Sequence, residues 1–179
     1  MLDHLAVRSD ARAHDDVHAD YISSYRANAA CTRELARLHE EVAACLTDAR
    51  VPADAMASDE PVIRRSPARC LVQLGPVALT VAWLQRAQGT VADGELLVVV
   101  WRGEVAVRTP QGFERAHQRS GASSATALWE SVLVVSAKSE TEWGWTPAGG
   151  KGDALSSAEL AHRCVERLRA AHTECTRER

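Results

Sequence analysis

Apolar and small side chains in the first part of the chain recur with the period of an α-helix. No glycine or proline interrupts residues 14–49, and Pro52 follows shortly afterwards, where a helix has to stop. At 1.5 Å per residue, a helix of roughly 30–40 residues is about 45–60 Å long. Alternating steps of three and four residues connect His14, Val17, Tyr21, Ser24, Asn28, Cys31, Leu35, Leu38, Val42, Cys45 and Ala49.

This stripe is the predicted partner-binding surface. A helix of that length is longer than a small sheet is wide, so part of it should protrude or pack on a second chain. We expect Tyr21, Leu35, Leu38 and Val42 to bury an apolar seam against another protein or a second copy of the chain. Burial contributes roughly 25 cal/mol per Å² before the costs of association are subtracted.

Between Arg69 and Trp145 the apolar positions alternate as they do in β-strands. Short runs rich in valine, leucine and tryptophan are separated by glycine- and proline-bearing turns. The run 96–101 is apolar on both faces, which is typical of a central strand. The pattern predicts strands over 70–74, 77–83, 96–101, 104–108, 128–137 and 140–146.

The last part of the chain predicts a second helix. Ser156 and Glu159 have the spacing of a capping box, and an apolar stripe from Leu160 to Cys175 follows. Short links between consecutive strands favour antiparallel pairing. The predicted fold class is therefore α+β: a mostly antiparallel sheet of about six strands, flanked by a long N-terminal helix and a C-terminal helix.

Three parts are expected along the chain. Residues 1–50 form an N-terminal tail and the long amphipathic helix, 51–68 form a proline-bearing linker, and 69–179 form one globular domain of sheet and C-terminal helix. The connection 109–126 is long and polar. Loops of this kind are functional, partly helical or disordered.

Composition narrows the class of protein. Hydrophobic residues make up 46% of the chain, enough for a sizeable core, and the net charge of −3 disfavours nucleic acid as a partner. Five cysteines without a CxxC pair indicate a reducing compartment.

The N-terminus lacks the apolar stretch of a signal peptide, and the longest apolar run is too short to span a membrane. Arginine greatly exceeds lysine, which is typical of GC-rich bacterial coding. We expect a soluble, cytoplasmic bacterial protein.

Two motifs resemble catalytic or cofactor sites and are set aside. His14 and His18 have the spacing of a zinc-protease helix, but an aspartate occupies the place of the general-base glutamate. An exposed first turn of the helix is the favoured interpretation. The glycine-rich segment 144–152 lacks the hydroxyl residue that a phosphate-binding loop needs after its lysine. We therefore predict no metal ligands, no cofactor and no catalytic residues.

Arg163 and Arg167 are interleaved with glutamates, as on an ordinary salt-bridged helix surface.

Trp143 and Trp145 lie two residues apart on one predicted strand, so both should point to the same face. Paired indoles of this kind either cover a core beneath a helix or stack a ligand. They are the candidate ligand-binding residues.

The order of helix, sheet and helix is similar to that of small bacterial chaperone-like dimers with terminal helices around a curved sheet. The leading hypothesis is a non-catalytic protein–protein interaction or oligomerisation module, adaptor or chaperone-like, that forms a homodimer or binds another protein through its first helix. The alternative is a small-molecule-binding protein or enzyme with a pocket at Trp143 and Trp145. A third hypothesis is a zinc-dependent hydrolase that uses His14 and His18.

Overall fold

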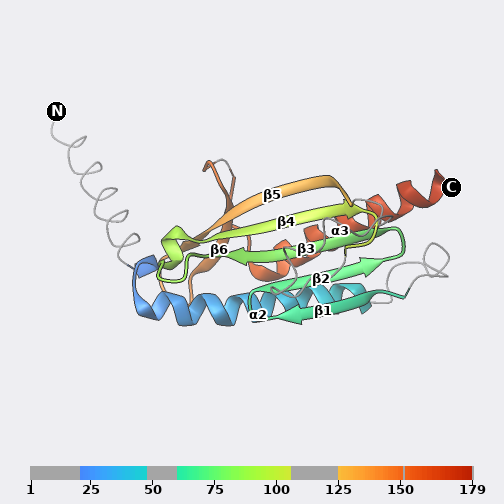
Figure 1. Cartoon of the computed structure of the whole chain (residues 1–179). Coiled ribbons are helices and arrows are strands. Elements are labelled where there is room, and N and C mark those ends of the chain that lie inside the picture. Colours follow the sequence, from blue (N-terminus) through green and yellow to red (C-terminus); the bar gives the residue numbers. More distant parts are fainter. Residues whose placement is uncertain (1–20, 48–59, 106–124, 151, 179) are drawn as a thin grey trace, which may run out of the picture.

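The computed structural model of the chain describes residues 21–47, 60–105, 125–150 and 152–178. Within these residues, six strands form one antiparallel sheet in the order β1-β2-β3-β4-β5-β6, and two long helices pack against it (Figure 1). The predicted α+β class is confirmed. The elements are α2 (Tyr25–Thr47), β1 (Val62–Ser66), β2 (Arg69–Leu74), β3 (Val77–Leu84), the 3₁₀ turn η2 (Val91–Asp93), β4 (Glu95–Arg102), β5 (Thr126–Ala137), β6 (Trp143–Pro147) and α3 (Ser157–Arg177).

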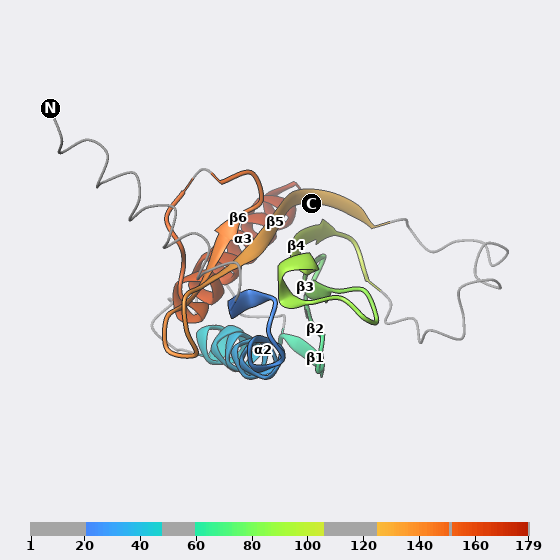
Figure 2. The same cartoon turned by 90° about the vertical axis from the view of Figure 1, so that its left-hand side faces the viewer.

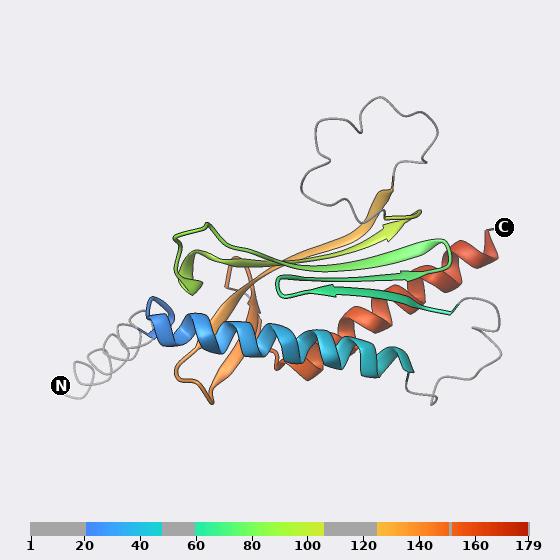
Figure 3. The same ribbon diagram turned by 60° about the horizontal axis from the view of Figure 1, so that its bottom comes forward.

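Both helices lie on the same face of the sheet, and the sheet curves around them (Figure 2). Figure 3 shows α2 and α3 in contact with each other below the sheet. The core is therefore enclosed by one sheet face and by two helices that also pack on one another. Within the described residues, neither helix is long and apolar enough to cross a bilayer.

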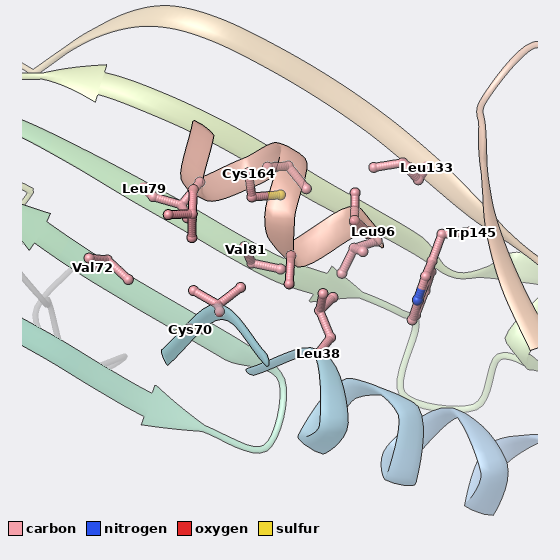
Figure 4. Close-up of a cluster of buried hydrophobic side chains, with 14 of the residues drawn as sticks. Leu38, Cys70, Val72, Leu79, Val81, Leu96, Leu133, Trp145 and Cys164 are labelled. Carbon is pink, nitrogen blue, oxygen red and sulfur yellow. The ribbon is translucent and has the colours of Figure 1, made fainter. Parts of the chain in front are cut away.

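The core follows from the period-2 pattern of the strands. Cys70, Val81 and Val98 lie side by side on adjacent strands and all face the helices. From α2, Leu38 reaches into the space between these side chains and Trp145, and Cys164 enters from α3 (Figure 4). Residues on both helices thus share one continuous core with the middle of the sheet.

The first helix is shorter than its hydrophobic pattern predicts. Residues 14–20 and 48–49 of the predicted helix lie outside the described residues, and Ser23 and Ser24 interrupt the helix between Tyr21 and Tyr25. The Ser24 Oγ accepts a hydrogen bond from the Ala27 N–H at 3.3 Å, as a serine does when it caps a helix. A serine side chain competes with the helical backbone for hydrogen bonds, and periodicity alone does not register this competition.

One strand lies where a linker was predicted. β1 falls inside 51–68 and pairs with β2, so the sheet begins before residue 69. β1 is an exposed edge strand in which Ile63 packs against the core, which explains why its pattern is weak. In contrast, the predicted strand 104–108 has no strand geometry at residues 104 and 105, and its remainder lies outside the described residues.

A buried hydrogen-bond relay joins three elements. The Trp145 Nε1–H donates to the Ser157 Oγ at 3.1 Å, and the Ser157 hydroxyl donates to the Glu34 carboxylate at 2.8 Å. We expect Ser157→Ala to lower the free energy of unfolding by about 1–3 kcal/mol, because the buried indole N–H of Trp145 loses its acceptor. Urea denaturation measures this change.

The matched control is Thr173→Ala on the exposed side of the same helix. The Thr173 hydroxyl donates only to the carbonyl of Arg169 one turn earlier. Its removal should change the free energy of unfolding by less than about 0.5 kcal/mol. Equal effects of the two substitutions would show that the relay adds nothing to stability.

Candidate functional site: a cleft beside the open edge of β5

β5 is much longer than its neighbour β6. Pairing between them begins at Ala137 with Trp143 and ends at Leu133 with Pro147. The Ala148 N–H still donates to the Val132 carbonyl at 2.9 Å. A turn then leads the chain away from the sheet, and Gly149 and Gly150 adopt positive φ angles of 103° and 72° there.

Among the described residues, the first half of β5 consequently has one unpaired edge. β4 pairs with it along its other side, and no described strand pairs with residues 126–131 on the β6 side. Figure 1 shows β5 as the upper border of the sheet. Backbone groups alternate in direction along a strand, and the Val132 carbonyl points to the β6 side. The N–H and C=O of Glu130 therefore point to this open edge as well.

A cleft of about 520 Å³ lies between this part of β5 and α3. Four buried apolar side chains lie at its base: Leu133, Leu155, Leu160 and Cys164. Exposed side chains of α3 and the half-buried Trp129 form its rim. The other lining residues are Trp129, Ser131, Pro147, Arg163, Glu166, Arg167 and Ala170. Leu133 and Pro147, the last pair between β5 and β6, both line the cleft, so it adjoins the end of β6.

Trp129 and two arginines set the chemistry of the rim. The Arg167 guanidinium carbon lies 5.7 Å from the Trp129 ring centroid, a cation–π contact. Among the described residues, neither Arg163 nor Arg167 forms an ion pair with a carboxylate, whereas Arg102 pairs with Glu178 at 2.9 Å. Arg163 still interacts electrostatically with the Glu159 carboxylate one turn earlier, although no ion pair closes between them. The cleft offers an apolar base and a cationic rim.

The predicted seam on the first helix is buried inside the chain. Leu35, Leu38 and Val42 are 3%, 0% and 0% exposed. α3 lies alongside α2 and covers the stripe together with the sheet, so these three residues cannot contact a second chain in the folded protein. Tyr21 is half-buried against the same core, and burial, followed by the nearby Glu140 carboxylate, raises its pKa. The predicted partner-binding role is therefore wrong for Leu35, Leu38 and Val42, and that of Tyr21 stays a prediction.

The two candidate ligand-binding tryptophans belong to an aromatic cluster. They do point to the same face, and their ring centroids lie 6.1 Å apart in an edge-to-face arrangement. Trp145 is 0% exposed and contacts Trp83 edge-to-face at 6.0 Å. Neither Trp143 nor Trp145 lines the cleft. Trp145 is closed to any ligand, and the indole that borders the cleft is Trp129, which the sequence pattern did not single out.

The candidate histidines and the five cysteines fare differently in the structure. His14 and His18 lie outside the described residues, and the part of the chain that is described holds no group of three or more potential metal ligands. No disulfide joins the five cysteines. Burial raises the pKa of Cys31 and Cys164 to about 12 and that of Cys70 to about 11. These three thiols stay protonated at neutral pH and are poor nucleophiles.

A second, smaller cleft of about 290 Å³ lies between α2 and the turn after β3. Its polar groups largely bind one another. The Gln85 amide donates to the Asn28 side-chain oxygen at 3.3 Å, and the Trp83 Nε1–H donates to the Gln85 oxygen at 3.1 Å. Trp83, Gln85 and Asn28 thus already use part of their hydrogen-bonding capacity within the chain.

Comparison of the chain with known protein families, curated proteins and solved structures gives no match. The site is therefore interpreted from its own geometry. Sequence periodicity contained two signals for it: the spacing of Arg163 and Arg167 by four residues, and the placement of Trp129 in phase with Leu133. The sequence did not show that β6 would end opposite Leu133 and leave the first half of β5 without a neighbour.

Proposed function

We propose that this chain is a non-catalytic protein–protein interaction module, adaptor or chaperone-like, and that its partner binds in the cleft between β5 and α3. The observation that carries the proposal is the coincidence of an unpaired strand edge with an apolar cleft. Natural proteins usually cover such edges, because exposed backbone donors and acceptors invite pairing with other chains. An uncovered edge next to a cleft suits recognition of another polypeptide.

The polar side chains around the cleft support binding rather than catalysis. Arginine stays protonated throughout the physiological pH range and cannot act as a general base. Glu166 lines the cleft and lies 3.5 Å from the exposed His162, an ion pair when that histidine is protonated. Arg163 and Arg167 instead provide fixed positive charge that selects a negatively charged partner.

A small carboxylate ligand is the second candidate. The cleft volume lies within the range of roughly 300–1,000 Å³ that is typical of small-molecule sites. An apolar acid could place its chain over Leu133 and Leu160 and its carboxylate near Arg163. The open strand edge, however, supplies backbone groups that such a ligand would not use, which favours a polypeptide.

The proposed compartment is the bacterial cytoplasm. The absence of disulfides among five cysteines, four of which are buried, is compatible with reducing conditions. The predominance of arginine over lysine supports a bacterial origin through coding bias.

A peptide-display library selected against the full chain tests the proposal. We expect selected peptides to bind with micromolar Kd, and Trp129→Ala to weaken that binding at least about tenfold, as the loss of an interfacial aromatic anchor does. Trp101→Ala is the matched control. Its indole is half-buried on the opposite face of the sheet and donates to the Thr80 hydroxyl.

Two results would remove the proposal. One is a library that yields no peptide above background. The other is a set of peptides that bind Trp129→Ala as tightly as the unaltered chain, provided that circular dichroism shows both variants folded.

A further inference from the structure

We infer that the partner segment binds in extended form, as an additional strand beside residues 126–131 of β5, with an acidic side chain between Arg163 and Arg167. This inference rests on the proposed function and names its ligand class: an extended peptide in which apolar and acidic residues alternate with outward-facing ones. The inferred strand continues the line of β6 beyond Pro147.

The backbone of β5 provides the pairing groups. Glu130 directs its N–H and C=O to the open edge, whereas the Val132 carbonyl is already occupied by Ala148. A bulge places Leu128 as an extra residue opposite β4 and bends the strand there. Regular pairing of an added strand with β5 is therefore short and centred on Glu130. We expect such short pairing to give micromolar affinity, so that side-chain contacts provide the specificity.

The other edges of the sheet are protected. Leu155 pairs with Trp145 through hydrogen bonds of 2.8 and 2.9 Å and covers the outer side of β6. At the opposite end of the sheet, β1 is short, and Arg64 and Arg65 place charge on it. Short length and charge are common means of discouraging edge pairing. The first half of β5 differs because an apolar cleft accompanies its edge.

Side-chain alternation explains how an added strand would fill the cleft. Trp129, Ser131 and Leu133 face α3, and Glu130 faces away from it. Every second side chain of an added strand would therefore point toward α3 and enter the cleft. Apolar side chains there would cover Leu133 and Leu160.

Charge determines what the rim prefers. Arg163 and Arg167 lie one helical turn apart and both line the cleft. Among the described residues, Glu166 is the one acidic side chain that lines it, so the three described charged groups sum to +1. A carboxylate from the partner can accept hydrogen bonds from the guanidinium groups, and arginine–carboxylate pairs are frequently bidentate. This preference supplies selectivity, since an exposed ion pair contributes little affinity.

The backbone part of the inference is tested with N-methylated peptides. The tightest peptide from the display library is synthesised with single N-methyl groups at successive positions, and each version is titrated calorimetrically into the full chain. An added strand predicts losses of about tenfold or more at alternate positions and less than about twofold between them. Glu130→Pro should weaken the unmodified peptide by a similar factor, because the N–H it removes lies outside the β4 ladder.

The charge part is tested with the double variant Arg163→Glu/Arg167→Glu. We expect it to weaken the selected acidic peptide at least about tenfold. Arg177→Glu, exposed on the same helix and outside the cleft, is the control and should change the affinity less than about twofold.

The outcomes separate this inference from the proposed function. Binding that depends on Trp129 but tolerates N-methylation at every position overturns strand addition and leaves the interaction module intact. Selected peptides without acidic residues overturn the charge preference. A stable dimer of the chain that Glu130→Pro dissociates would show that a second copy occupies the edge, and this too overturns the inference. Failure to select any peptide removes the proposed function itself.

Discussion

Leu38→Ala should lower the free energy of unfolding by about 3–5 kcal/mol. Leu38 is 0% exposed and lies where α2, α3 and the sheet meet (Figure 4). Shortening it removes the transfer free energy of a buried leucine and leaves a cavity that close-packed neighbours cannot fill. Urea denaturation followed by circular dichroism measures the loss.

The control is Leu84→Ala, which removes the same atoms from a side chain that is 51% exposed. Its effect on the free energy of unfolding should stay below about 1 kcal/mol, because little apolar surface returns to water.

Comparing Leu38→Ala with Leu84→Ala also tests whether the apolar stripe of α2 is core or docking surface. A docking surface would tolerate Leu38→Ala with unchanged stability and show weaker self-association, and that pattern would contradict the burial described above.

Acidification should destabilise the protein through His39. Burial, assisted by the positive charge of Arg65, lowers the pKa of His39 from about 6.5 to about 4. Between these two values the unfolded chain binds a proton that the folded chain does not bind. Stability is therefore lost as the pH falls from about 6.5 to about 4, by up to about 3 kcal/mol for this group.

His39→Leu should flatten this part of the pH profile, because leucine does not titrate. The control is His162→Gln, since the His162 side chain is 67% exposed and should leave the acid profile in place. The measurement is the free energy of unfolding by urea at half-unit steps between pH 4 and 7.5. Parallel acid profiles for His39→Leu and the unaltered chain would contradict a buried neutral histidine.

The fold was predictable where local pattern and tertiary environment agree. The alternation in residues 77–83 and the double-sided apolar run 96–101 mark strands in the middle of the sheet, which are buried as expected. The sequence pattern did not reveal β1, because this edge strand buries few apolar side chains. Ile63 packs against the core, and one such residue shows no alternation of apolar and polar positions. The hydrophobic pattern thus identifies central strands better than peripheral ones.

The candidate site was not predictable for a different reason. Periodicity shows that Leu35, Leu38 and Val42 share a face of the helix, but it does not show that α3 lies against that face. Likewise, the cleft exists because β6 ends opposite Leu133 while β5 continues to Thr126. Both facts depend on which segments meet in space, and neither is present in the pattern of any single segment.

The most direct test of the open edge as a binding site is an amide chemical-shift titration of the full ¹⁵N-labelled chain with the tightest selected peptide. If a peptide binds at this edge, the largest changes occur at the Glu130 amide, the Trp129 indole N–H and the amides of 163–170. The opposite result would be that the largest changes occur on the exposed side of α2, at Arg37 and Glu40, while Glu130 and Trp129 stay unchanged.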